Sequence, residues 1–288
     1  MSKSIKSLKD SLSALRPASY GLLVFIILAI IFLLLFSRVR RDVEAERKPV
    51  SPPITEQPVK KKLAKPDKGR IAIIIDDFGY NYNDVTQAFL KLDADLTYAI
   101  IPGHNYSQRF AREASKAGYE IMIHMPMESN GKLHGEEGYI LETGMTSAEI
   151  ERRVQLAVDH IPQASGMNNH QGSKATQDAR LMTIVGTLLK KNKKYFIDSR
   201  TTAETIAEEK IRVMGVPVSR RDIFLDNDSD PLLIRRQIDK MIQMATRRGS
   251  VVGIGHGRPA TLQVLQTEIP RLKADGYRFV FASRIVRK

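Results

Sequence analysis

IAIIIDDFG, at residues 71–79, is a run of mostly branched apolar side chains that leads into two adjacent aspartates. A continuous apolar run of this kind is typical of a strand that is buried on both faces, as in parallel sheets. Carboxylates at the end of such a strand need polar partners or solvent, because an isolated buried charge is costly. The stretch therefore predicts a central parallel strand with polar side chains at its carboxyl end.

Further apolar segments along the chain have the same strand-like composition. They are residues 97–101, 120–124, 194–198, 211–216, 251–255 and 278–282. Segments with helical character lie between them, and one of these opens with the capping-box sequence TSAE. They are residues 83–92, 107–117, 146–160, 178–191, 231–246 and 261–274. This alternation predicts an α/β fold in which helices cover a parallel sheet, either as a barrel or as an open sheet.

Residues with chemical function gather at the ends of the predicted strands and in a short segment near Gly166. In parallel α/β folds these carboxyl ends meet at one edge of the sheet, where ligands bind. Each residue taken alone also has a structural explanation, such as a helix cap, a hydrogen-bonded core histidine or a loop position. Their shared placement favours a functional site. The residues are Asp76, Asp77, His124, His170 within NNHQGS (168–173), Asp198 and His256.

This set of side chains is chemically coherent. Two histidines and one carboxylate can hold zinc or another divalent transition metal and leave positions open for water and substrate. A second carboxylate can accept a proton from the attacking water, and a further histidine can serve as general acid. Adjacent residues such as Asp76 and Asp77 point in different directions, so the pair can divide these tasks.

An uncharged segment precedes the α/β region. Between Arg16 and Arg38 lie 21 residues without a charge, which as a helix would be about 32 Å long, enough to cross a hydrocarbon core of roughly 30 Å. The segment has no polar face, as a core helix would have, and no small-residue cleavage site, as a signal peptide would have. Basic residues flank it on both sides, so charge does not decide its orientation. We therefore expect a short tail at 1–16, a transmembrane anchor at 17–37, a Pro-, Lys- and Glu-rich linker at 38–69 and a folded domain at 70–288.

Composition limits the classes of function. The chain of 288 residues has no cysteine, which excludes a disulfide scaffold, a thiolate zinc site and a cysteine nucleophile. The formal net charge is +13, but residues 1–68 carry 14 Lys/Arg against 6 Asp/Glu, so the domain itself is only mildly basic. A nucleic-acid partner is not expected, because such proteins show a basic face and a recognisable binding module.

Several segments between Arg70 and Ile285 together resemble the divergent polysaccharide deacetylases, relatives of the NodB-like carbohydrate esterases. The resemblance implies a distorted parallel (β/α) barrel with fewer than eight regular units. It also implies a divalent metal, expected to be zinc, at the carboxyl ends of the strands. The segments are IAIIIDDFG (71–79), AIIPG (99–103), IHMPME (123–128), NNHQGS (168–173), IDSRTT (197–202), FLDND (224–228) and IGHGRPATL (254–262).

The same resemblance assigns roles to the residues at the strand ends. It makes Asp76 the catalytic base, Asp77 a metal ligand and His256 the catalytic acid. His124 is similar to the first histidine of the H-x-x-x-H motif found in ordinary members, where it binds the metal.

The chain also departs from the ordinary pattern. Glu128 stands where the motif has its second histidine, so the third ligand is either Glu128 or His170, and we prefer His170. The R-x-P-Y segment, which helps ordinary members bind substrate, is not recognisable. We expect Asp198 to orient a ligating histidine, and Arg200 and Arg258 to meet substrate oxygens or to pair with carboxylates.

The sequence therefore predicts a membrane-anchored, metal-dependent hydrolase that removes N- or O-acetyl groups from an envelope polysaccharide. The resemblance places the domain on the periplasmic side of the inner membrane. The alternative is a non-catalytic envelope protein that keeps the deacetylase fold and binds a glycan or a protein partner. Asp76 together with His256 favours the enzyme, because a binding module needs no acid–base pair. The missing second histidine and R-x-P-Y segment favour the alternative.

Overall fold

The chain divides into two units, Met1–Ala64 and Lys65–Lys288. The computed structural model describes residues 25–38, 68–131, 136 and 138–288. In the first unit the described residues form one helix, at 25–38, whose apolar side chains are largely exposed. Among the described helices, none combines the length and the apolar character needed to span a membrane. Residues 17–24 of the predicted anchor, the tail at 1–16 and most of the predicted linker lie outside the described residues.

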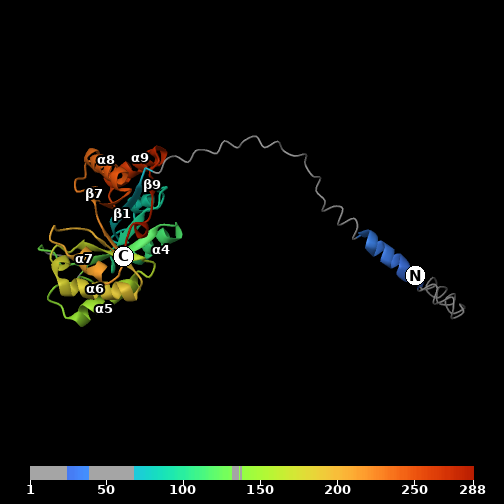
Figure 1. Ribbon diagram of the computed structural model, residues 1–288, viewed down its shortest axis with the longest axis horizontal. Coiled ribbons are helices and arrows are strands. Elements are labelled where there is room, and N and C mark those ends of the chain that lie inside the picture. The colour runs from blue at the N-terminus through green and yellow to red at the C-terminus, as the bar shows by residue number, and fades with distance from the viewer. Residues whose placement is uncertain (1–24, 39–67, 132–135, 137) are drawn as a thin grey trace. The chain divides into compact units, whose positions relative to one another are not determined.

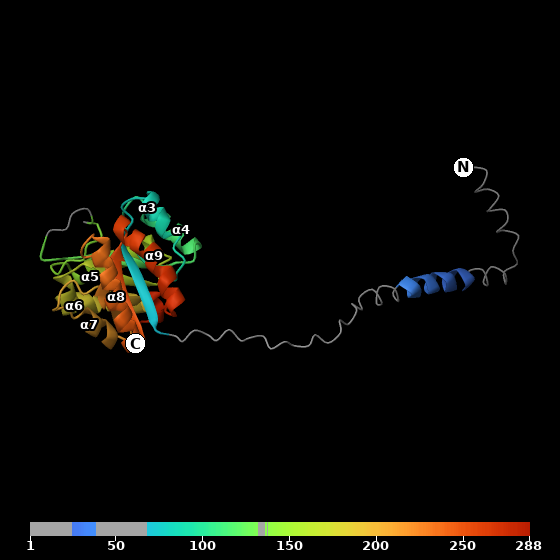
Figure 2. The same ribbon diagram turned by 90° about the horizontal axis from the view of Figure 1, so that it is seen from above.

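The second unit alternates strands and helices, and the helices form an outer layer around the strands (Figures 1 and 2). The strands are β1 (Arg70–Phe78), β2 (Thr97–Ile100), β3 (Glu120–Met127), β4 (Gly166–Gln171), β5 (Tyr195–Asp198), β6 (Val218–Arg220), β7 (Ile223–Phe224), β8 (Ser250–His256) and β9 (Arg278–Phe279). The helices are α3 (Asp84–Phe89), α4 (Ser107–Lys116), α5 (Ser147–His160), α6 (Ala179–Lys191), α7 (Ala207–Val213), α8 (Pro231–Arg248) and α9 (Pro259–Asp275), with short 3₁₀ helices at Ala175–Gln177 and Ala282–Arg284.

The strands form one parallel sheet in the order β6-β5-β4-β3-β2-β1-β8-β7, and β9 pairs with β1. The two ends of this hydrogen-bonded path, β6 and β7, are separated in the chain only by Arg221 and Asp222. The sheet therefore curls until its ends are joined by a two-residue link, which we call the β6–β7 link. This confirms the predicted parallel α/β class as a curled, incompletely paired barrel, with fewer strand–helix units than a regular eightfold barrel.

Strand β1 shows why the apolar run at 71–75 specifies the centre of the sheet. Ile71, Ile73 and Ile75 pack in the core between sheet and helices, whereas Ala72 and Ile74 pack in a second core inside the curl. Each fully buried isoleucine contributes about 1.5–3 kcal/mol. Side chains alternate along a strand, so the next residue on the inner face is Asp76. The alternation of β1 side chains between the two cores thus places the carboxylate of Asp76 at the carboxyl end of the strand, on the inner face of the sheet.

One local prediction is wrong. Residues 211–216, predicted as a strand, belong largely to α7 and the turn after it. The start of this helix favours helical structure, because the Thr205 hydroxyl accepts a hydrogen bond from the Ala207 N–H. Glu208 and Glu209 also suit the first turn of a helix. Residues 168–171, in the short segment near Gly166 that is not among the predicted strands, form the end of β4, paired in register with β3. Their polar side chains are in a strand because that strand ends at the functional edge of the sheet.

Candidate active site

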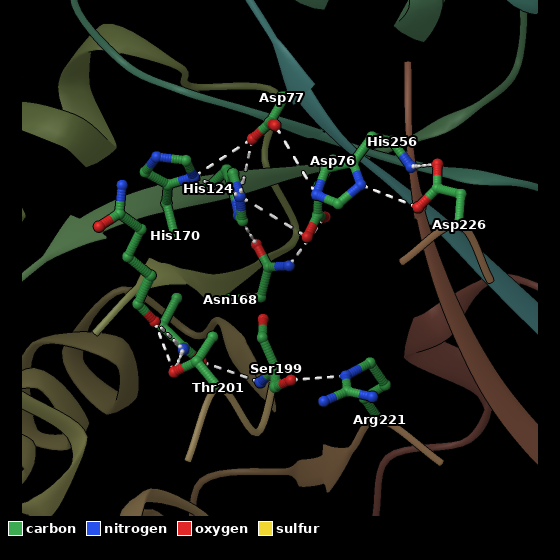
Figure 3. A network of polar contacts seen from close by, with 12 residues as sticks. Asp76, Asp77, His124, Asn168, His170, Ser199, Thr201, Arg221, Asp226 and His256 are labelled. Carbon is green, nitrogen blue, oxygen red and sulfur yellow. Dashed lines mark hydrogen bonds and ion pairs between the residues drawn. The ribbon is translucent and has the colours of Figure 1, made fainter. Parts of the chain in front are cut away.

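The carboxyl ends of four strands bring together five of the predicted site residues (Figure 3). Asp76 and Asp77 come from β1, His124 from β3, His170 from β4 and His256 from β8. The parallel register sets part of this arrangement, because Asp76 pairs with His256 across β1 and β8. The predicted convergence of acidic and imidazole groups at this edge of the sheet is therefore present.

Asp77, His124 and His170 form a compact group, which we call the metal triad. Asp77 Oδ1 lies 3.3 Å from His124 Nε2 and 3.2 Å from His170 Nδ1, and the two ring nitrogens are 3.0 Å apart. Tetrahedral coordination with metal–ligand distances of about 2.0–2.2 Å separates neighbouring donor atoms by roughly 3.3–3.5 Å. Asp77 Oδ1 is buried and receives no hydrogen bond from any described residue. The triad is thus a candidate metal site. It fits a divalent transition metal in the type and spacing of its donor atoms, and its carboxylate oxygen Asp77 Oδ1 has no hydrogen-bond donor among the described residues.

Asp77 reaches this position through an unusual backbone conformation. Its φ angle is 68°, in the left-handed region that only glycine enters at no cost, although aspartate tolerates it better than most residues. The pairing of β1 with β2 shifts register between Ile75 and Phe78, so the strand is irregular at this point. Such strain costs about 1–3 kcal/mol and is typical of functional sites. Here it aims Asp77 at the histidines of β3 and β4, while Asp76 stays on the inner face of the sheet.

Asn168, on β4, connects Asp76 with His124 of the metal triad. Its amide Nδ2 donates to Asp76 Oδ1 at 3.0 Å, and its Oδ1 lies 2.8 Å from His124 Nδ1. An ionised carboxylate can only accept hydrogen bonds, so the amide oxygen must face the ring, and His124 Nδ1 must be the donor. In the neutral ring, the lone pair is then on His124 Nε2, which lies beside Asp77 and His170. Asn168 therefore fixes the tautomer that a ligating histidine requires.

The charges of the site are strongly coupled. Burial lowers the pKa of His124, but the carboxylates of Asp76 and Asp77 outweigh burial and raise this pKa to about 9. Burial alone would raise the pKa of Asp77, yet the imidazoles of His124 and His170, 3.3 and 3.2 Å from its Oδ1, hold it well below its usual range. The pKa of Asp76 is raised by burial, which its histidine neighbours oppose only in part. A metal ion must therefore displace a tightly held proton from His124, since only a neutral imidazole coordinates.

His256 lies on the other side of Asp77 and is held by a buried aspartate. Asp226 Oδ1 lies 2.9 Å from His256 Nδ1, and Asp226 Oδ2 accepts hydrogen bonds from the His256 N–H at 2.7 Å and the Thr261 hydroxyl at 2.5 Å. His256 Nε2 then faces the triad, 3.7 Å from Asp77 Oδ2. Burial lowers the pKa of His256, but the bond with Asp226 and the charges of Asp77, Asp226 and Asp76 together outweigh burial and raise it. This pair can hold and deliver a proton at Nε2.

Two predicted supporting residues have other roles. Asp198 was expected to orient a histidine, but its carboxylate accepts hydrogen bonds from the Arg200 N–H and the Thr205 hydroxyl, at 2.8 and 2.9 Å. It shapes the loop after β5, and the orienting partners are instead Asn168 and Asp226. Glu128, the alternative third ligand, accepts hydrogen bonds from Thr143 and pairs with Lys174 at 2.6 Å, outside the metal triad.

The two predicted arginines differ in position. Arg258 is exposed, and its guanidinium donates to the Asp226 carbonyl at 3.0 Å, so it braces the segment that carries Asp226. Arg200 lines a cleft of about 460 Å³ that also contains Asp76, His124, His170 and His256. Of the two, only Arg200 lines the cleft that contains Asp76 and His256.

The sequence does not reveal the roles of several residues at this site. Asn168 and Asp226 lie in the segments NNHQGS and FLDND, which resemble the family but predict no role for these two residues. Arg221 and Ser199 line the same cleft; Ser199 lies in the family-like segment IDSRTT, and the sequence assigns a role to neither residue. The contacts of Asn168 with His124 and of Asp226 with His256 join distant parts of the chain, so no local pattern shows them, although ligating and catalytic imidazoles need a partner on the second nitrogen.

We expect His170→Ala to lower metal binding and Glu128→Gln to leave it unchanged. His170 contributes a ring nitrogen to the metal triad, whereas Glu128 is engaged with Thr143 and Lys174. Loss of one of three protein ligands should weaken binding by more than the about 10–100-fold typical of outer-sphere changes. The check is metal content of both variants after dialysis at limiting free zinc. Retention by His170→Ala with loss by Glu128→Gln would move the third ligand to Glu128.

Comparisons with known proteins agree with this geometry. Residues 73–286 match the family model described as divergent polysaccharide deacetylase. An uncharacterised protein of Haemophilus influenzae is 37% identical over 208 residues, which cover 72% of this chain and 74% of that protein. The uncharacterised protein YibQ of Escherichia coli strain K12 is 38% identical over 207 residues, which cover 72% of this chain and 64%, less than two thirds, of YibQ.

A solved structure supports the fold. The crystal structure of an uncharacterised protein from Agrobacterium tumefaciens C58 superimposes with a TM-score of 0.72 at 20% sequence identity, covering 77% of this chain and 93% of that chain. At this identity the likeness concerns the fold alone. The family model, which matches more than half of the chain, carries the assignment: this chain belongs to the divergent polysaccharide deacetylase family.

Proposed function

We propose that this protein is a metal-dependent hydrolase that removes acetyl groups from a polysaccharide of the cell envelope. One observation carries the proposal: the carboxylate of Asp77 stands between the two triad histidines and His256, with Asp76 beside them. A metal site, a candidate base and a candidate acid thus share one cleft. A protein that only binds a glycan has no need for this combination.

The metal triad would hold the ion through one carboxylate and two imidazoles, a donor set that suits zinc. When bound, such an ion polarises the acyl carbonyl and makes an attacking water more acidic. Asp77 and the two histidines are the residues that would hold it, and Asn168 fixes which ring nitrogen of a neutral His124 carries the proton.

Asp76 is the proposed general base. Asn168 occupies its Oδ1, so Oδ2, 3.6 Å from His124 Nε2, is the oxygen free to take a proton from water at the triad. Burial raises the pKa of Asp76, and a base works best when its pKa lies closer to the working pH. The inner-face position of Asp76 on β1 thus supplies both its location and its basicity.

His256 is the proposed general acid. As the acetamide C–N bond breaks and the water oxygen joins the acyl carbon, Nε2 of His256 gives its proton to the leaving nitrogen. Asp226 keeps Nδ1 protonated and stabilises the imidazolium form before transfer. The proton that Asp76 takes from water balances the proton that His256 gives, so the products are acetate and an amine.

The segment at 17–37 is proposed as the anchor that holds the domain at the inner membrane, with the domain in the periplasm next to its acetylated polysaccharide. In support, the described part of this segment is a helix with exposed apolar side chains, among them Phe25 at 71% and Phe32 at 67% exposed. Exposed apolar surface of this extent is typical of a membrane or protein contact. No nucleic-acid partner is proposed.

We expect the full chain to sediment with membranes and a chain that begins at Lys68 to remain soluble. The reason is that residues 17–37 carry the uncharged apolar run, whereas the domain buries its own apolar residues. The measurement is fractionation of cells that express each form, followed by carbonate extraction. A full chain that stays in the supernatant would rule out the anchor.

The hydrolase is tested by acetate release. The zinc-loaded full chain is incubated with acetylated glycans, including peptidoglycan fragments and acetylated exopolysaccharides, and acetate is measured. We expect release from at least one glycan, with loss on chelation and recovery on zinc addition. Binding of a glycan without acetate release under all metal conditions would favour the non-catalytic alternative instead.

A further inference from the structure

Arg221 occupies the β6–β7 link and is half-buried beside the active site. Its Nε donates to the Ser199 carbonyl at 2.6 Å, and its Nη2 donates to the Arg200 carbonyl at 2.7 Å. Within the described residues, neither Arg221 nor Arg200 forms an ion pair with a carboxylate. Both side chains line the cleft that contains Asp76 and His256. The cleft therefore holds positive charge that the described protein does not neutralise by direct pairing.

The geometry of Arg221 leaves part of its guanidinium available. This group carries five N–H donors in a rigid plane, and the two carbonyls of the loop after β5 occupy one edge of it. The unused donors lie on the remaining edges, and a pair of parallel N–H groups is the arrangement that binds a carboxylate through both oxygens. Burial lowers the pKa of Arg221, as expected of a cation that lacks a full set of partners.

Ser199 provides a second, independent observation. Its side chain is 5% exposed, and its hydroxyl is buried with no hydrogen-bond partner among the described residues. Its backbone is held in place, because the Ser199 N–H donates to Asn169 Oδ1 at 2.9 Å. Figure 3 shows the side chain directed toward Asn168, the residue that joins Asp76 to His124. Serine is an unfavourable choice at this buried position unless something else satisfies its hydroxyl.

We propose that Arg221 and Ser199 form a subsite for a carboxylate of the substrate. The substrate class is then an acetylated glycan in which the acetylated sugar or its direct neighbour is acidic, as in a uronic acid or a carboxylated ether. This assignment rests on the proposed function. A carboxylate offers two oxygens in one plane for Arg221 and a lone pair for the Ser199 hydroxyl, and its single charge balances one guanidinium. The acyl group would then lie toward the metal triad.

The test compares an acidic probe with its neutral ester and with a phosphate probe. An acetylated disaccharide of an N-acetylhexosamine and a uronic acid is compared with its methyl ester and with N-acetylglucosamine 6-phosphate. Binding to the chelator-treated full chain in detergent is measured by calorimetry, and acetate release is measured with the zinc-loaded chain. We expect the wild type to bind the acid about 10–100-fold more tightly than the ester, the usual value of a charged hydrogen-bonded pair.

Three variants assign the effect to residues. Arg221→Gln should abolish the preference for the acid, whereas Arg220→Gln should keep it, because Arg220 is 53% exposed and pairs with Glu208 outside the cleft. Ser199→Ala should reduce the preference by roughly two- to tenfold without lowering the melting temperature, because its hydroxyl has no described partner to lose. Because Ser199→Ala should fold normally, the proposal stays testable even if Arg221→Gln does not fold.

Several results would overturn the subsite. These are equal binding of acid and ester, an equal loss of both in Arg221→Gln, or a preference for the phosphate. The last would indicate a site for a dianion rather than a carboxylate. The two proposals fail separately. Acid-selective binding without acetate release would refute the hydrolase and keep the subsite, whereas acetate release without charge preference would refute the subsite and keep the hydrolase.

Discussion

Asp76→Asn is expected to abolish acetate release while the chain keeps its metal. The substitution preserves shape but removes the group that accepts the proton of water, and general-base help is worth about 10²–10⁴-fold. Metal binding should persist, because Asp77, His124 and His170 remain. The introduced amide also sits beside the Asn168 amide, so its carbonyl oxygen can still accept the hydrogen bond from Asn168 Nδ2.

The measurements are initial rates of acetate release and metal content of the same preparations. Asp93→Asn is a matched control, because the Asp93 side chain is 98% exposed and pairs with Lys273 on the surface. His256→Ala should slow the reaction by the same order, about 10²–10⁴-fold, since it removes the acid. Wild-type rates in Asp76→Asn would show that another group takes the proton, and coincident loss of metal would show that Asp76 is a ligand.

The second large effect concerns the metal. His124→Ala removes a metal-triad side chain that is 3% exposed and lies beside the carboxylates of Asp76 and Asp77. It should reduce metal affinity by much more than an outer-sphere change does. Asn168→Ala leaves all three ligands but frees the His124 tautomer, and should reduce affinity by about 10–100-fold. The two variants should therefore form a graded series.

Competition with a zinc-sensitive dye measures both affinities, and circular dichroism confirms that the variants are folded. His160→Ala is the control, because His160 ends α5 and takes no part in the triad. If His124→Ala bound zinc as tightly as the wild type, His124 would be a core histidine held by carboxylates and the metal assignment would be wrong. Equal losses in His124→Ala and Asn168→Ala would show instead that the whole site collapses when either residue is removed.

The sequence predicts the fold well where local pattern and burial agree. The run at 71–75 is apolar at every position because β1 is buried on both faces, and this local signal survives in the structure. The pattern misleads at 211–216, where Ile211 and Val213 look strand-like but lie on α7 after a helix-favouring start. The sequence could not decide between a barrel and an open sheet, because closure depends on pairing between strands far apart in the chain.

In the candidate site, too, local sequence features predict some residues, and contacts between distant parts of the chain decide the others. Aspartates and histidines at strand ends are visible in the sequence, because their chemistry is distinctive and the strands before them are apolar. The roles of Asn168 and Asp226 cannot be predicted in this way, because each residue contacts the ring nitrogen of a histidine that is far away in the sequence, His124 and His256 respectively. Asp198 was misjudged for the opposite reason, since its placement at a strand end suggested a histidine partner, but the folded loop satisfies both of its oxygens.

The β6–β7 link has a consequence for how the domain tolerates changes in length. Surface connections between strands usually accept inserted residues at little cost. Here Arg221 and Asp222 join the two ends of the curled sheet, the Arg221 N–H donates to the Asp198 carbonyl, and the Asp222 N–H donates to the Val252 carbonyl. One added residue would separate these anchors and turn the guanidinium of Arg221 away from the cleft. Insertional diversity in this domain is therefore restricted at this connection, and loop grafting or permutation is better directed to the exposed turns at the opposite edge of the sheet.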